Sequence, residues 1–172
     1  MKNQKKIIIP LTVTVIVAII VVCITIILLR NNGAPEDVAL KFHNSLLPDY
    51  NTQGIEQCVG TDVYNVRFND NGYFADRYTR SREQIVYYYG EDFSSELSDI
   101  DVYDASDSEK SSITREYKSK YSLEVDDVKI VNFTVTLSSE YGEKSRNQSL
   151  TVLKIGEDWF IYDYDAYWFA YM

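Results

Sequence analysis

The 172-residue chain contains a single histidine, His43, so any Ser–His–Asp or Cys–His arrangement would have to use it. No G-x-S-x-G nucleophile motif accompanies it. His43 follows Phe42 on an expected helix, where a solvated or partly packed histidine is far commoner than a catalytic base. One histidine without paired cysteines cannot build a histidine-rich zinc site, and no glycine-rich phosphate loop occurs. We therefore predict no catalytic, metal-binding or cofactor-binding residue.

Acidic residues suggest a second chemistry, calcium binding, which requires about six to eight oxygen ligands. Two groups come close together in the sequence: Asp99, Asp101, Asp104 and Asp107, and then Asp126, Asp127, Glu157, Asp158, Asp163 and Asp165. The EF-hand loop pattern fails, because placing Gly72 at its glycine puts Arg67 at the first ligand and Tyr78 at the last. We interpret both groups as solvated turn residues.

Aromatic residues are abundant, with 15 Tyr, seven Phe and two Trp. Tyr and Trp combine an apolar ring with a polar tip, which suits both core packing and binding surfaces. They either fill the fold or form an exposed platform for a protein, peptide or glycan partner. The C-terminal end is the candidate interaction surface, with Tyr164, Tyr167, Trp168, Phe169 and Tyr171.

An uncharged apolar run occupies residues 7–29, from Ile7 to Leu29. About 20 apolar residues are needed for a helix that crosses a bilayer, and a helix satisfies its own backbone there. Lys2, Lys5 and Lys6 precede the run, and basic residues favour the cytoplasmic side. We expect a cytoplasmic basic segment (1–6), a transmembrane helix in membrane lipid (7–29), a linker (30–35) and a domain outside the cell (36–172).

A cleaved signal peptide is the alternative interpretation of this run, but its apolar core is usually only about 7–15 residues long. The best cleavage candidate, Asn32-Gly33-Ala34, has an unsuitable first residue and is followed by Pro35. The retained anchor is therefore favoured, which would make the protein single-pass, with its N-terminus inside.

Residues 31–172 carry all 26 acidic residues and 13 of the 17 basic ones. Such an acidic domain repels nucleic acid and anionic lipid headgroups, so we expect no nucleic-acid partner. Cys58 is the only cysteine in this part, which excludes an internal disulfide. Extracellular domains of animal origin usually carry disulfides, so we expect a bacterial surface protein, from a cell with a single membrane.

Helices are expected first. Val38, Phe42 and Leu46 recur at steps of four, which predicts a helix over residues 36–47. A second short helix should follow, capped by Asn51 or Thr52 and ended by Gly60. Residues 61–80 fit a small hairpin or an irregular loop around the turn signal at 69–72. The capping-box pattern at 81–84 then predicts a new helix that ends at Gly90.

Strands dominate the remainder. Residues 99–104 are predicted as a short strand with Ile100 and Val102 inward, followed by a helix capped by Asp107 or Ser108. A strand is expected over 128–139 because alternate residues are apolar: Val131, Phe133, Val135 and Leu137. Further strands are expected over 150–155 and 159–164, joined by turns at 141–144 and 156–158. Helices on one face of an antiparallel meander make an α+β domain.

This order of elements is similar to the cystatin-like roll of the nuclear-transport-factor-two superfamily. The helix at 36–47 and the segment 128–163 carry the resemblance, and 154–161 (KIGEDWFI) looks like the final hairpin of small exported or anchored bacterial members. Members include isomerases, dehydratases and binding modules, so the resemblance implies a fold more than a function.

We therefore expect an anchored, non-catalytic binding or interaction module outside the cell. The alternative is a small-molecule enzyme of isomerase or dehydratase type, which would use an Asp/Tyr pair in the cavity of the roll. No spacing in the sequence selects such a pair. A third interpretation, a membrane-complex subunit, is less favoured because the span lacks a G-x-x-x-G packing motif.

Overall fold

The computed structural model describes residues 33–67 and 73–163. These form an α+β fold in which helices come first and a four-stranded antiparallel sheet follows, as predicted. The elements in chain order are α2 (Pro35–Leu46), α3 (Thr52–Val59), α4 (Thr61–Arg67), α5 (Tyr73–Tyr89), β1 (Ser94–Asp104), α6 (Asp107–Tyr121), β2 (Asp127–Ser139), β3 (Gly142–Ile155) and β4 (Asp158–Asp163).

The strands lie in the order β1-β2-β3-β4, each antiparallel to its neighbour. β2 and β3 form a long hairpin in which Ser139 pairs with Gly142 across a two-residue turn. The predicted turn at 141–144 and the predicted strand start at residue 150 are therefore wrong. The first half of β3 carries almost no apolar side chain, so the alternation on which the prediction relied is missing there.

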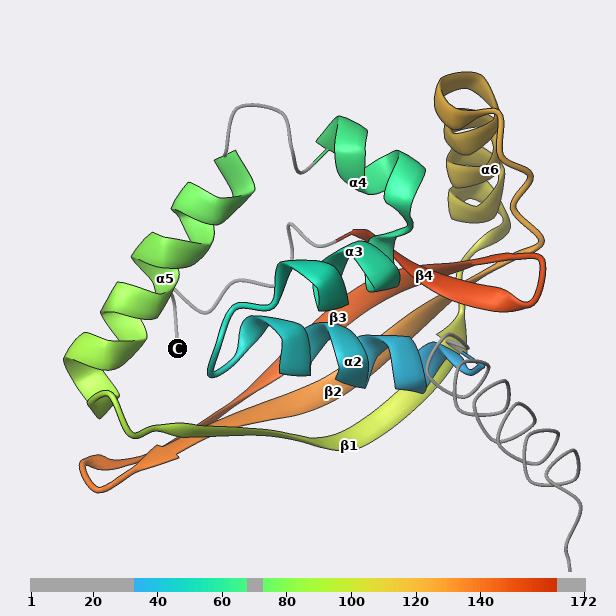
Figure 1. Ribbon diagram of the computed structural model, residues 1–172. Coiled ribbons are helices and arrows are strands. Elements are labelled where there is room, and N and C mark those ends of the chain that lie inside the picture. Colours follow the sequence, from blue (N-terminus) through green and yellow to red (C-terminus); the bar gives the residue numbers. More distant parts are fainter. Residues whose placement is uncertain (1–32, 68–72, 164–172) are drawn as a thin grey trace, which may run out of the picture. The chain divides into compact units, whose positions relative to one another are not determined.

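One face of the sheet carries the main core. Figure 1 shows α2 and α3 lying across this face. The predicted alternate residues of β2 are all buried against it, as are residues of both helices: Val131, Phe133, Val135 and Leu137, with Val38, Phe42, Leu46, Ile55 and Val59. The four-residue stripe of α2 and the alternation of β2 are thus confirmed.

Of the described elements, only α6 covers part of the other face, at one end. Val128 and Leu153 pair across β2 and β3, point away from α2 and are nevertheless buried. Beside them α6 packs its buried Tyr117, whose ring centroid lies 5.9 Å from that of Tyr162 in β4. The prediction that all helices lie on one face is therefore wrong, because α6 packs at this end.

Residues 61–80 are largely helical, which corrects the predicted hairpin or loop. α4 begins directly after Gly60, and α5 begins at Tyr73. The predicted capping box is also wrong, because Ser81 is a buried residue inside α5. Tyr78, Ser81 and Ile85 lie three and four positions apart on its buried face, so packing overrides the local capping signal. Gly90 does end this helix.

Helix α6 begins one residue earlier than expected. Ser106 is its N-cap and forms a capping box with Glu109, whereas the predicted caps were Asp107 or Ser108. On its surface, Lys120 Nζ lies 2.9 Å from Oε1 of Glu116, one helical turn earlier.

Strand β1 differs most from its prediction. It is eleven residues long and contains a bulge between Ser98 and Asp101, where Asp99 has a positive φ of 50°. Val102 pairs with the buried Val131 and so lies on the core face of the sheet, as predicted, yet it is 40% exposed. Ile100 lies within the bulge and is 36% exposed. The cause is position, because β1 is an outer strand of the sheet and no described element pairs with its outer side.

Within the described residues, no helix is long and apolar enough to cross a bilayer. The predicted span at residues 7–29 lies outside them.

Candidate functional site

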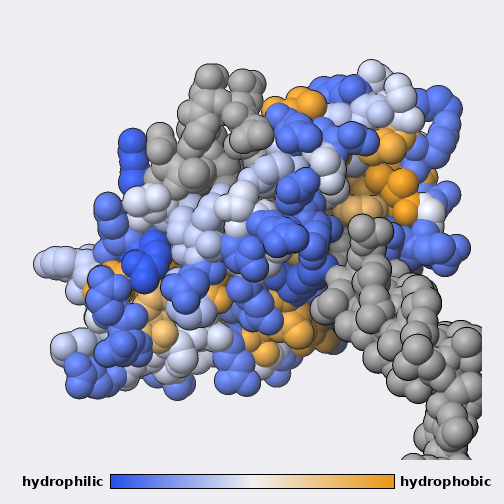
Figure 2. Space-filling model, in the orientation of Figure 1, coloured by the Kyte–Doolittle hydropathy of each residue, from blue (hydrophilic) through white to orange (hydrophobic). Residues whose placement is uncertain are grey.

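A cavity of about 320 Å³ lies where the α3–α4 turn meets β4, and we call it the Gly60 pocket. Its apolar lining consists of Val59, Val63, Leu123, Ile155 and Phe160. Its polar rim consists of Glu56, Gln57, Thr61 and Asp62. Hydrophobic surface is visible where α4, α6 and the β3–β4 turn meet (Figure 2). These residues come from four separate parts of the chain, so the pocket exists only in the folded domain.

Gly60 shapes one wall. It ends α3 with a φ of +87° and donates its N–H to the Glu56 carbonyl at 2.8 Å. Its own carbonyl accepts from the N–H of Tyr64, so α4 starts without an intervening loop. A Cβ at this position would lie 3.4 Å from the Phe160 ring. Glycine thus permits both the backbone conformation and the close approach of the turn to β4.

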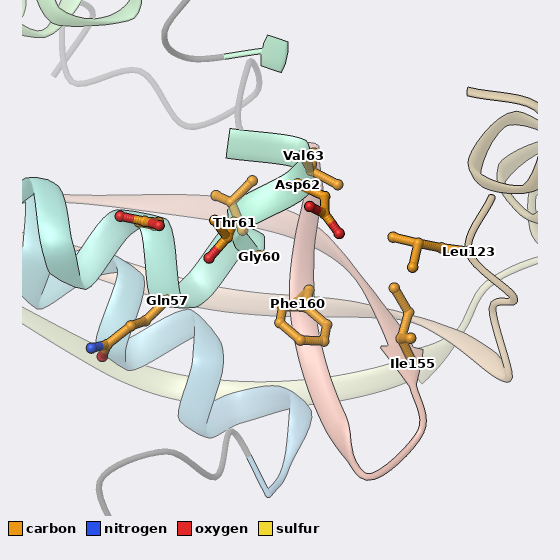
Figure 3. A pocket seen from close by; sticks show the side chains of 10 residues that line it. Gln57, Gly60, Thr61, Asp62, Val63, Leu123, Ile155 and Phe160 are labelled. Carbon is orange, nitrogen blue, oxygen red and sulfur yellow. The ribbon is translucent and has the colours of Figure 1, made fainter. Parts of the chain in front are cut away.

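The opposite wall is built by the β3–β4 hairpin and the segment after α6. Ile155 and Phe160 stand on either side of the hairpin turn, and Leu123 follows α6. Figure 3 shows their side chains gathered below Val63 and Asp62. Trp159 is buried, whereas Phe160 is only partly buried and lines the pocket.

The pocket can hold an apolar group through its walls and a hydrogen-bond donor or cation at its rim. Glu56 and Asp62 supply carboxylate oxygens there, and none of the described lining residues is basic. Ligand pockets commonly combine a mainly apolar lining with a few polar groups that fix orientation. Sequence patterns indicated Gly60 only as a helix end, since nothing local shows which distant strand a turn will meet.

His43 is fully packed inside the domain, in contrast to the solvated or partly packed position expected. It is 1% exposed, and its Nε2 lies 2.9 Å from Ser95 Oγ in β1. Burial lowers the pKa of His43 to about 4, and the hydrogen bond with Ser95 acts in the opposite direction. At neutral pH the imidazole is therefore uncharged and joins α2 to β1. Neither residue lines the Gly60 pocket.

Cys58 is also buried, on the inner side of α3. Burial raises the pKa of its thiol to about 12, with the charge of Lys41 acting the other way. A thiol that is neither ionised nor accessible is a poor nucleophile.

Among the described side chains, which do not include Asp163 and Asp165, no three His, Cys, Asp or Glu groups are arranged to hold a metal ion. Asp104 instead binds Lys129 and Lys110, with Nζ–Oδ1 distances of 2.7 and 3.3 Å. Hydrogen bonds from these two lysines hold the pKa of Asp104 below its usual range.

Tyrosines take both of the roles considered above. Tyr117 is buried, whereas Tyr87 and Tyr88 at the end of α5 are exposed. Tyr50 and Tyr78 stack with ring centroids 4.4 Å apart, and burial raises the pKa of Tyr50 to about 12, helped by Tyr64 and Tyr78. The candidate interaction surface Tyr164, Tyr167, Trp168, Phe169 and Tyr171 lies outside the described residues.

An Asp/Tyr pair of the isomerase kind would show a carboxyl group with a raised pKa beside a tyrosine hydroxyl. In the described part of the chain, the carboxyl groups with a resolved pKa shift are Asp104, Glu109 and Asp127, and all three shift downward. The space between the sheet and α2 and α3 is filled by buried apolar side chains. Asp104, Glu109 and Asp127 do not line the Gly60 pocket.

Comparisons with protein-family models, with curated proteins and with solved structures found no match for this chain.

Proposed function

We propose that this protein is a non-catalytic binding module, held outside the cell by a membrane anchor at residues 7–29. The observation that carries the binding role is the Gly60 pocket. Its volume of about 320 Å³ is at the lower end of the range for small-molecule sites, which begins near 300 Å³. It suits a small ligand or one large apolar side chain of a partner.

The anchor is supported by the uncharged apolar run and by the lysines that precede it. A cystatin-like roll of the nuclear-transport-factor-two type is supported by the order of elements, with helices before a long antiparallel hairpin. An enzyme of isomerase or dehydratase type remains the second candidate. It would gain support if a ligand of the pocket were chemically converted.

Fragment binding to the full-length protein in lipid nanodiscs tests the binding role. Methyl NMR signals of Val63, Leu123 and Ile155 should shift with small apolar fragments, and shift most when the fragment carries an amine. A Leu123→Trp substitution should fill the pocket and abolish these shifts. Leu40→Trp is the matched control, because Leu40 is exposed on α2 and is not among the pocket-lining residues. Equal binding to L123W and wild type would refute the pocket as the site.

Protease treatment of intact cells tests the location. We expect the domain to be digested while a short N-terminal fragment stays with the membrane. A full-length chain recovered from the cytosol, without a lipid-associated fraction, would overturn the anchor.

A further inference from the structure

Strand β1 leaves one edge of the sheet open. It is the outer strand beside β2, and Figure 1 shows it on the side of the sheet away from β4. Its pairing partners all belong to β2, from Ser94 with Ser138 to Asp104 with Lys129. Among the described residues, no backbone group accepts or donates along its outer side. A row of free N–H and C=O groups is a template for another strand.

Apolar side chains accompany this open edge. Ile100, Val102 and Tyr103 are 36%, 40% and 51% exposed, although their residue types favour burial. Asp101 and Tyr103 also border a shallow hollow of about 600 Å³ on the polar face of the sheet, beside Asn132 and Thr134. Strand addition uses a free backbone edge and nearby side-chain sites together. The backbone hydrogen bonds give affinity, and the side-chain sites on the faces of the sheet give specificity.

The charge of β1 selects the partner. The strand carries four carboxylates and no basic residue: Glu96, Asp99, Asp101 and Asp104. Asp104 is neutralised by Lys129 and Lys110, which leaves three acidic groups along the edge. A second copy of β1 would bring like charges face to face, which is destabilising. A strand rich in Lys and Arg would meet the opposite charge.

The bulge sets the length of the site. Pairing with β2 runs from Ser94 to Ser98, is interrupted, and resumes at Asp101. A partner strand can therefore pair regularly with only one half of β1. The exposed apolar residues Ile100, Val102 and Tyr103 lie at the bulge and after it. Bulges of this kind are often found beside functional sites.

We propose that the β1 edge binds an extended, Lys/Arg-rich segment of a partner protein by strand addition along Ile100 to Tyr103. The partner's backbone bonds to the free edge, and its basic side chains face Asp99 and Asp101, the carboxylates at this half of the strand. The Gly60 pocket lies at the other edge of the sheet, so this surface is separate from the binding function proposed above.

A synthetic peptide of alternating lysine and valine, titrated into the full-length protein in neutral-lipid nanodiscs, tests the proposal. We expect binding that slows amide hydrogen exchange at Ile100 to Tyr103 and weakens as salt rises from about 50 mM to about 500 mM. The same peptide with alternate backbone N–H groups methylated keeps its charge but cannot extend the sheet. It should bind about tenfold more weakly.

Asp101→Lys should lower the affinity of the protein for the unmodified peptide by about tenfold. Glu157→Lys makes the same charge change on the β3–β4 turn, and this variant should bind the peptide with an affinity close to that of wild type. Equal affinity of the methylated and unmodified peptides would overturn strand addition, because the attraction would then be charge alone. Equal losses in the two variants, or dimerisation of the protein through β1, would likewise overturn the proposal.

Discussion

The two outer strands of one sheet are treated in opposite ways. β4 is six residues long, with Trp159 and Ile161 buried and Phe160 covered by the turn at Gly60. β1 is eleven residues long and mostly exposed, with a bulge and four carboxylates. The turn between α3 and α4 thus packs against β4, whereas no described residue pairs with the outer side of β1.

This difference shows two solutions to the problem of free strand edges. An edge can be covered by other elements. At β4 the turn between α3 and α4 packs against the strand but leaves a cavity, the Gly60 pocket. An edge can instead stay open if charge and a bulge discourage pairing with identical strands. A covered edge offers a concave site for a small group, and an open one offers backbone to an extended chain.

The largest expected contrast comes from two isoleucines. Ile161→Ala in β4 should lower the free energy of unfolding by about 3–4 kcal/mol, because Ile161 is fully buried. Ile100→Ala in β1 should cost about 1 kcal/mol or less, since more than a third of this residue is already exposed. Urea unfolding of both variants measures this. Similar losses would show that the two edges are equally covered.

His43 provides the next test, because it joins α2 to the open edge through Ser95. Its pKa is about 4 in the folded state and 6.5 when unperturbed. Between these values the unfolded chain binds the proton more readily, so the stabilisation present above pH 6.5 is lost as pH falls. The loss should reach about 3 kcal/mol at pH 4. Unfolding free energies measured from pH 7 to pH 4 should fall less in His43→Gln, and parallel curves would contradict this.

A smaller effect is expected at the closed edge from Gly60→Ala. The positive φ and the nearby Phe160 ring should together cost about 2 kcal/mol. Gly33→Ala is the control, because a Cβ there meets nothing within 4 Å. Thermal unfolding compares the two, and an unchanged Tm for G60A would show that the turn is free to move away from β4.

The smallest change in stability should follow from neutralising the open edge. A variant with Glu96→Gln, Asp99→Asn and Asp101→Asn should have a free energy of unfolding within about 0.5 kcal/mol of that of wild type. All three side chains are exposed, so their replacement changes few contacts. It should nevertheless self-associate more at high concentration, since the charge that opposes edge pairing is gone. Sedimentation velocity measures this, and a monomer at all concentrations would argue against that role of the charges.

The sequence predicted well the elements in which apolar residues recur at regular steps because one face of the element is buried. The stripe of α2, the short helix ended by Gly60 and the alternation of β2 all face a common core. It failed for β1 and for the first half of β3, which are held by pairing with β2 and carry few buried side chains. Local patterns record which face is buried, and they carry little information about strands defined mainly by their neighbours.

The candidate site was harder to predict than the fold. Gly60 and Phe160 were each assigned correctly to a helix end and a strand, but a hundred residues separate them in the chain. Their contact depends on how α3 crosses the sheet, which no local spacing encodes. The Ser95 partner of His43 was missed for the same reason.

The buried Cys58 thiol can report on opening of the folded domain, because a dye can reach it only when the domain opens. In the native domain Cys58 should resist alkylating dyes and should not form a disulfide with another chain, even in oxidising surroundings. Labelling then requires α3 to separate from the sheet, so the rate of dye incorporation measures how often the wall of the pocket opens.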